Sequence, residues 1–306
     1  MYLMIIMLKF FVYFFHFMLS VGFFMFMERK FLSLSHLREG PNKVMFKGYL
    51  QFLFDMFKLL SKFFFFLFSF NFFFYFIMPL ILFINMLVMW VMLPFNSGFL
   101  NTEITILYFI VLLLLKMYFF VLMIFFIFSS YSYISMIRII IQVISYDIII
   151  ILVFLFNFII YSDFSFFMFI FNNISFIFFV NVFIIFIWVM SIMVELIRLP
   201  FDFYEGESEL ISGFNIEYGS FLFLVLVLIE YMEIIYFIIL TVFLFLYFDF
   251  NSIIFYFVVY LMVFFFIWFR VFFVRYRLDK MLIVLWKFIF PFTMINIFFY
   301  YYLNLI

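Results

Sequence analysis

Long apolar segments alternate with short polar segments along most of this 306-residue chain. An α-helix of about 20 residues crosses roughly 30 Å of hydrocarbon, and each apolar segment is at least that long. We therefore predict an all-α membrane protein with eight transmembrane helices and both termini on the same side. The predicted spans are about 2–27, 66–93, 104–127, 134–157, 174–197, 219–247, 252–273 and 281–303. No repeat or composition boundary separates a soluble domain, so residues 1–306 are expected to form a single membrane domain.

Residues 44–63 carry a different pattern, in which polar positions recur every three or four residues among apolar ones. These positions are Lys47, Gln51, Asp55, Lys58 and Lys62. Such a spacing places them on one face of a helix. One polar stripe on an otherwise apolar helix is typical of a helix lying in the membrane interface. We predict an amphipathic interfacial helix here.

The composition excludes a soluble fold and most redox cofactors. Hydrophobic residues make up 73% of the chain and charged residues only 10%, against about 25% charged in a soluble domain. Cysteine is absent, which excludes disulfides and thiolate-ligated zinc or iron–sulfur clusters in this chain. His16 and His36 are the two histidines and could supply at most one pair of haem ligands. We expect no redox cofactor and no metal in this chain.

The residue usage also suggests where the chain is made. Phe occurs 68 times and Met 22 times, whereas alanine is absent. Residues with A/T-rich codons dominate, which indicates an A/T-biased genome such as that of an organelle. The N-terminus has no Arg- and Ser-rich transit peptide and no small-residue cleavage site, as expected for synthesis inside the organelle.

Basic residues predict the orientation of the spans. The loops after spans 1, 3, 5 and 7 hold twelve of the 16 Lys and Arg residues, whereas the opposite loops at 94–103, 158–173 and 248–251 hold none. The twelve are Arg29, Lys30, Arg38, Lys43, Lys47, Lys58, Lys62, Arg198, Arg270, Arg275, Arg277 and Lys280. By the positive-inside rule, these odd-numbered loops face the side of synthesis. In a mitochondrion that side is the matrix.

One acidic stretch, 195–218, stands between two apolar walls on the basic side. Its six acids are Glu195, Asp202, Glu205, Glu207, Glu209 and Glu217, and its single cation is Arg198. Apolar residues alternate with the acids, which favours a loop at 198–218 that packs on another surface and lines a wet cavity. Because the loop is negatively charged, it is a candidate to dock against the basic loops on the same side. A solvated acidic loop and, for Glu195 with Arg198, a snorkelling pair at a helix end are the alternatives.

Several charges fall inside predicted spans, where each costs about 2.5–3.5 kcal/mol on insertion scales. Asp147 lies near the middle of the fourth span, and Glu230 lies in the sixth with Glu233 on the same face three residues later. Arg138 is nine residues from Asp147, about 13 Å along a helix, so it cannot neutralise that acid locally. Buried acids without a local partner are typical of an ion or proton path, with a structural role as the alternative.

Lysines within the spans carry weaker signals. Lys116 lies midway along the third span. It could form a proton-relay pair with a buried acid, or it could be incidental. Lys9, like His16, is interpreted as incidental.

Four groups of motifs resemble the NADH dehydrogenase subunit 1 family, the quinone-site membrane subunit of respiratory complex I. The first group is Glu28-Arg29-Lys30, Leu37-Arg38-Glu39-Gly40-Pro41-Asn42 and Asp55-x-x-Lys58-Leu59. The second is Arg138-x-x-x-Gln142-x-x-Ser145-Tyr146-Asp147. The third is Glu195-x-x-Arg198-x-Pro200-Phe201-Asp202-x-x-Glu205-Gly206-Glu207-Ser208-Glu209 through Glu217-Tyr218. The fourth is Glu230-Tyr231, Arg270, Arg275-x-Arg277-x-Asp279 and Leu285-Trp286-Lys287. They follow the family's order and cover most of the chain.

The resemblance implies a subunit of the mitochondrial inner membrane that forms much of the ubiquinone tunnel and couples quinone reduction to proton translocation. Ubiquinone would be its substrate at a shared site, while NADH, flavin and iron–sulfur clusters would bind to partner subunits. The implied partners are the hydrophilic quinone-site and iron–sulfur subunits, adjacent antiporter-like membrane subunits and membrane lipid. The resemblance also implies that the chain binds no nucleic acid and that it does not contain a complete active site by itself.

Roles follow position by position from the same resemblance. The implied proton path comprises Asp147, Glu195, Glu205, Glu207 and Glu230. Because like charges packed closely raise some pKa values, we predict that Glu205 and Glu207 form the gate of this path. The implied quinone cavity and tunnel comprise Arg38, Asp55, Asp202 and Arg277. The supporting positions are Arg198, Glu209, Glu217 and Arg138. A stand-alone cation/proton antiporter or channel, and the membrane subunit of an ion-translocating hydrogenase, are the competing hypotheses.

Overall fold

The computed structural model describes residues 2–43, 46–62, 72–93, 104–126, 130–161, 182–203, 218–246 and 252–305, and every regular element among them is helical. The α-helices are α1 (Tyr2–Ser35), α2 (Gln51–Ser61), α3 (Phe72–Val91), α4 (Thr105–Ile124), α5 (Ser130–Tyr161), α8 (Val182–Glu195), α9 (Ser220–Leu246), α10 (Ile253–Phe272), α11 (Leu278–Val284) and α12 (Phe290–Leu305). A 3-10 turn, η1 (Phe46–Gly48), precedes α2, and a π-helical turn, η3 (Leu285–Ile289), joins α11 to α12.

Six helical segments in the described part of the chain are long and apolar enough to cross a membrane. They are Phe73–Val91, Thr105–Met123, Ser132–Ile160, Ser220–Leu246, Ile253–Phe272 and Leu278–Tyr302. The prediction of an all-α membrane protein is therefore confirmed. Two further apolar helices are outside this set: the 34-residue α1 and the 14-residue α8. The count of eight spans stays a prediction.

Helix α1 continues eight residues beyond the predicted span, through Glu28 to Ser35. No Gly or Pro interrupts this stretch, and Glu28 is buried against other helices, so its charge does not end the helix. The helix ends where Leu37 adopts a left-handed conformation (φ 53°) and the Arg38 amide donates to the Ser33 carbonyl at 3.0 Å. That hydrogen bond closes the last turn in the manner of a Schellman cap.

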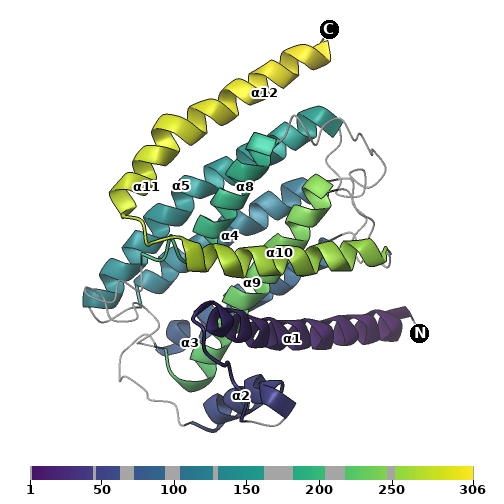
Figure 1. The fold of residues 1–306 in the computed structure, drawn as a ribbon, viewed down its shortest axis with the longest axis vertical. Helices are drawn as coiled ribbons and strands as arrows, with labels where there is room; N and C mark the ends of the chain where they lie inside the picture. Colours follow the sequence, from purple (N-terminus) through teal and green to yellow (C-terminus); the bar gives the residue numbers. More distant parts are fainter. Residues whose placement is uncertain are drawn as a thin grey trace.

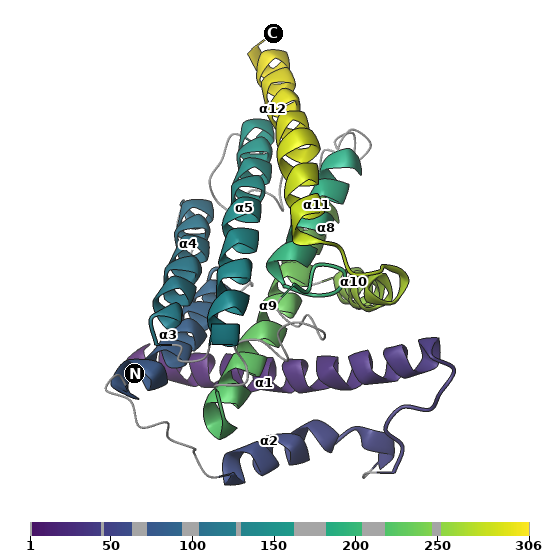
Figure 2. The same ribbon diagram turned by 90° about the vertical axis from the view of Figure 1, so that its left-hand side faces the viewer.

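The helices form a bundle in which α5 and α9 make most of the contacts. Helix α5 packs against α8, α12 and α4, whereas α9 packs against α3, α10, α2 and α1. Figure 1 shows α12 running along α5 toward the C-terminus, and Figure 2 shows α1 lying across the bundle at a steep angle to α5. Because α8 packs against both α5 and α9, a charge at the buried end of α8 lies close to both of these helices.

Large aromatic side chains fill the interior, because the chain contains no alanine and few glycines. Trp188 of α8 is fully buried, and its ring meets Phe154 of α5 edge-on at 5.4 Å between centroids. Phe109 of α4 stacks on Tyr236 of α9 at 5.7 Å. Offset and edge-on aromatic pairs of this kind add about 0.5–1.5 kcal/mol each beyond their buried area. They connect α4 with α9 and α5 with α8.

Helix α2 lies beneath α1 and occupies most of the predicted interfacial segment (Figure 2). None of its residues is fully buried, yet it packs against both α1 and α9. Gly22 of α1 permits this approach, since a Cβ there would come within 2.2 Å of the Phe52 ring. The helix is shorter than the predicted 44–63: Lys47 lies in the preceding 3-10 turn with a left-handed backbone (φ 59°), and Lys62 follows the helix in an extended conformation, so both lie outside α2. The interfacial location of α2 remains a prediction.

A candidate site of buried charges

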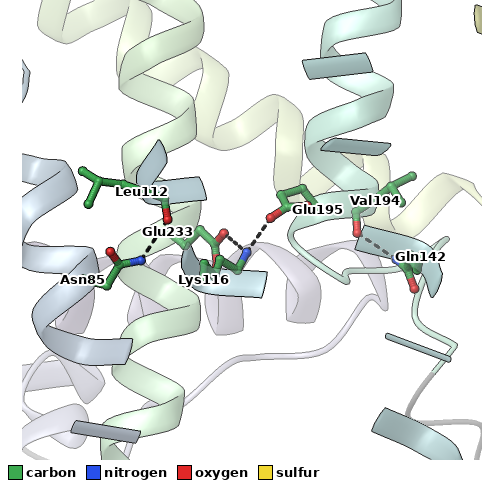
Figure 3. Close-up of polar contacts among 7 residues, drawn as sticks. All are labelled: Asn85, Leu112, Lys116, Gln142, Val194, Glu195 and Glu233. Carbon is green, nitrogen blue, oxygen red and sulfur yellow. Dashed lines mark hydrogen bonds and ion pairs between the residues drawn. The ribbon is translucent and has the colours of Figure 1, made fainter. Parts of the chain in front are cut away.

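Three charged side chains from three helices meet in the interior of the bundle (Figure 3). The Lys116 ammonium of α4 donates to Glu195 at the C-terminus of α8, at 2.6 Å, and to Glu233 of α9. Their side chains are 2%, 1% and 7% exposed, respectively. Buried ion pairs persist only where the charges contact each other directly, because desolvation costs several kcal/mol per ion. We call Lys116, Glu195, Glu233 and the neighbouring Asp147 the inner cluster.

Asp147 brings a third carboxyl to the inner cluster. It is buried on α5 and interacts electrostatically with Glu195, Lys116 and Glu233. One ammonium cannot balance three carboxylates, and two unit charges 4 Å apart interact by about 4 kcal/mol at an effective dielectric constant of 20. The arrangement is therefore suited to holding and releasing protons.

Two amide side chains fix the helices that carry the inner cluster (Figure 3). Asn85 of α3 donates to the Leu112 carbonyl at 3.1 Å, one turn before the lysine of α4. Gln142 of α5 donates to the Val194 carbonyl at 2.7 Å and to the Phe201 carbonyl at 3.0 Å. The two hydrogen bonds of Gln142 thus hold both the end of α8 and the start of the acidic loop. Glu195 is thereby placed between two anchored carbonyls.

A second group of charges lies where α1, α9 and α10 meet the end of α8. Its members are Glu28, Arg198, Glu230, Tyr231 and Arg270, and we call it the outer cluster. Glu28 accepts hydrogen bonds from Arg270 and, at 2.7 Å, from the Tyr231 hydroxyl. Arg198 lies 3.9 Å from Glu28 and 3.7 Å from Glu230, with its guanidinium 4.7 Å from the centroid of the Tyr231 ring. Arg198 therefore connects α8 to both α1 and α9.

Two small cavities adjoin the clusters. One of about 30 Å³ is lined by Lys116, Glu195, Glu233 and Glu230, together with apolar side chains. A second, of about 20 Å³, borders Glu28 and the two arginines of the outer cluster. A polar cavity of roughly 10–15 Å³ or more can hold a water molecule. The larger cavity thus offers a water-sized link between Glu230 in the outer cluster and the carboxyls of the inner one.

The start of the acidic loop docks on the basic segment between α10 and α11. Asp202 is buried and lies 3.5 Å from Arg275. The Tyr276 amide donates to the Pro200 carbonyl at 2.9 Å, and the rings of Phe201 and Tyr276 stack at 5.6 Å. For the described residues, the expected contact between the acidic loop and a basic loop is present.

The predicted site residues divide into several groups in space. Asp147 and Glu195 join the inner cluster, and Arg198 and Glu230 join the outer one. Asp55 pairs with Arg29 at 3.0 Å between α2 and α1. Of the other predicted positions, Arg38 and Arg277 are exposed and Arg138 is partly buried on α5. Glu205, Glu207, Glu209 and Glu217 lie outside the described residues.

Five further residues of the two clusters have no role that the sequence predicts. Glu28, Tyr231 and Arg270 belong to the family motifs, Lys116 suits two interpretations, and Glu233 is distinguished only by its spacing from Glu230. The three-residue spacing of Glu230 and Glu233 was the usable signal, because it places both acids on one helix face. No local pattern predicts the two partners of Lys116, because Glu195 is 79 residues and Glu233 is 117 residues away along the chain.

No group of three or more His, Cys, Asp or Glu side chains among the described residues could hold a metal ion. The described chemistry is that of carboxylates, guanidiniums, one ammonium and one phenol. Such groups can accept, hold and relay protons and orient a polar ligand.

Known proteins resemble this chain over nearly its whole length. The family model described as NADH dehydrogenase matches residues 8–301. The NADH-ubiquinone oxidoreductase chain 1 of Rhipicephalus sanguineus is 36% identical, covering 94% of this chain and 91% of that protein. The chain of the same name from Apis mellifera ligustica is 32% identical, with 94% of each covered. An NADH-quinone oxidoreductase subunit of Rickettsia prowazekii is 30% identical, covering 91% of this chain and 87% of its own length.

Proposed function

Because this chain belongs to the NADH dehydrogenase family, as a subunit of complex I of the chain 1 type, we propose that it lines the ubiquinone site and relays protons away from it. The observation that carries the proposal is the pair of buried charge clusters linked by a water-sized cavity. Family membership favours this function over a stand-alone antiporter or a hydrogenase subunit.

The quinone chamber is formed where the first loop, the acidic loop and the α10–α11 segment approach one another. Asp202 with its partner Arg275 forms one wall. Arg38 and Arg277, which are exposed in this chain, face the hydrophilic subunits that deliver electrons from NADH through flavin and iron–sulfur clusters. Asp55, paired with Arg29, lies at the end where quinone arrives from the bilayer.

Proton relay starts from the acids of the loop at 198–218 and continues inward. Quinone reduction consumes protons and changes the charge of the chamber, so acids such as Glu205 and Glu207 exchange protons in response. The change in charge reaches Glu230 through its ion pair with Arg198. Glu230 then passes a proton across the cavity to Glu195, which interacts with Asp147. The adjacent antiporter-like subunits take over from there.

The membrane arrangement completes the proposal. Helices α1 and α8 join the six long spans to give eight crossings of the mitochondrial inner membrane. The odd-numbered loops face the matrix, where the hydrophilic subunits dock. This chain contributes side chains only, and electron carriers are bound by its partners.

A photoreactive ubiquinone analogue tests the quinone assignment in the intact complex. We expect illumination to label this chain within residues 28–62, 198–217 or 273–277, because those three segments surround the chamber. Excess unlabelled ubiquinone should remove the label. Competable labelling confined to other subunits would contradict the placement of the quinone site.

A further inference from the structure

The ammonium of Lys116 is shared by two carboxylates on different helices. It lies 2.6 Å from Glu195 Oε1 of α8 and also contacts Glu233 Oε1 of α9. All three side chains are at least nine-tenths buried, so water does not screen the pairs. A single positive charge between two carboxylates can fully balance only one of them.

Glu195 faces more acids than bases from the helices packed around it. Lys116 approaches from α4, Glu233 from α9 and Asp147 from α5, and Glu230 borders the same cavity. Oε2 of Glu195 and Oδ1 of Asp147 are buried without a hydrogen-bond partner among the described residues. A buried carboxyl oxygen without a donor is costly, and a proton on either carboxyl would supply one. A single proton shared by these carboxyls would therefore lower the cost of burying them.

We propose that Lys116 is a positioning residue that alternates between Glu195 and Glu233, and that the carboxyl it leaves is the one that takes up the proton. The inference rests on the proposed proton relay and adds to it a residue pair, Lys116 with Glu233, that selects which acid is loaded. The motion required is small, since both contacts exist in one structure.

The proposed cycle conserves atoms and charge. The carboxyl of Glu230 gives up a proton, water in the cavity relays it, and the proton binds a carboxyl oxygen of Glu195, so Glu230 is left as a carboxylate and Lys116 then pairs with Glu233 alone. When the Glu195 O–H bond breaks and the proton passes to Asp147, the ammonium returns to Glu195. The lysine keeps its three N–H bonds throughout, so it steers the proton without carrying it.

The test combines infrared difference spectra of carboxyl C=O stretches with proton translocation in the intact, reconstituted complex. In Lys116→Met, Glu195 loses its cation, so we expect the band of one additional protonated carboxyl at rest. That band should be absent in Lys116→Met/Glu195→Gln. Lys280→Met, which removes an exposed lysine of α11, is the matched control and should give the parent spectrum. A Lys116→Met spectrum equal to that of the parent would overturn the proposal.

A charge-balanced double variant separates steering from simple neutralisation. Glu233→Gln keeps the shape of the side chain but leaves Lys116 on Glu195, so proton transfer should slow by about tenfold or more. Lys116→Met/Glu233→Gln removes one charge of each sign. We expect it to stay slow, whereas recovery to the parent rate would mean that the lysine only balances charge. Because the infrared band reports Glu195 whether or not the complex pumps, it separates this inference from failure of the proposed relay.

Discussion

Replacing Glu195 by Gln is expected to abolish most proton translocation while quinone reduction continues. Glu195 is 1% exposed, it contacts Lys116 at 2.6 Å, and it interacts electrostatically with Asp147. The amide keeps the volume of the carboxyl but cannot bind and release a proton near neutral pH. Loss of a positioned proton-transfer group typically slows the transfer by about 100-fold or more. The measurement is the pH change outside sealed vesicles driven by NADH oxidation.

Ser191→Ala is the matched control for this prediction. Ser191 is equally buried one turn earlier on α8, and its hydroxyl bonds to the Trp188 carbonyl of the same helix. It should pump as the parent does. Parent-like pumping in Glu195→Gln would remove Glu195 from the relay.

Replacing Glu28 by Gln is expected to destabilise the junction of α1, α9 and α10. Glu28 accepts hydrogen bonds from Arg270 and Tyr231 and lies 3.9 Å from Arg198. Without its charge, two partly buried guanidiniums remain, with Glu230 as the acid of the cluster. Removing one partner of a buried ion pair costs about 3–5 kcal/mol, and exposure of the arginines reduces this to about 2 kcal/mol.

The rate of thermal inactivation of NADH:ubiquinone reductase activity measures this loss. Glu28→Gln should inactivate faster than the parent at a given temperature. Glu39→Gln removes an exposed carboxylate of the segment that follows α1 and should inactivate at the parental rate. Equal rates for Glu28→Gln and the parent would show that the outer cluster does not stabilise the junction.

Helix positions followed from the sequence wherever apolar runs were bounded by polar residues. The run at 219–247 became α9 (Ser220–Leu246), and the run at 252–273 became α10 (Ile253–Phe272). At α1 the charged residues Glu28, Arg29 and Lys30 suggested an end that the helix does not have. A charge ends an apolar run but not a helix, and Glu28 stays helical because distant groups satisfy it.

The acids of the site were predictable and their partners were not. An acid in an apolar span stands out because its burial is costly, which identified Asp147, Glu195 and Glu230. The partner of each acid depends on which helices pack together, and that is a long-range property. Glu28 meets Arg270 across 242 residues, and no local spacing specifies such a contact.

The division into inner and outer clusters gives the proposed proton path an internal order. Arg198 follows Glu195 by three residues, yet it pairs in the outer cluster while Glu195 pairs with Lys116 in the inner one. Likewise Glu230 and Glu233, one turn apart on α9, belong to different clusters. The end of α8 and the middle of α9 therefore each contribute residues to both clusters.

The number of protons translocated per electron in Glu205→Gln/Glu207→Gln tests the central claim most directly. These two acids begin the proposed relay on the quinone side, and the substitution removes their charge at nearly constant volume. We predict that the double variant reduces ubiquinone at a rate close to the parent's but translocates far fewer protons per electron. An unchanged ratio of protons to electrons would contradict the claim that this loop couples quinone reduction to proton movement.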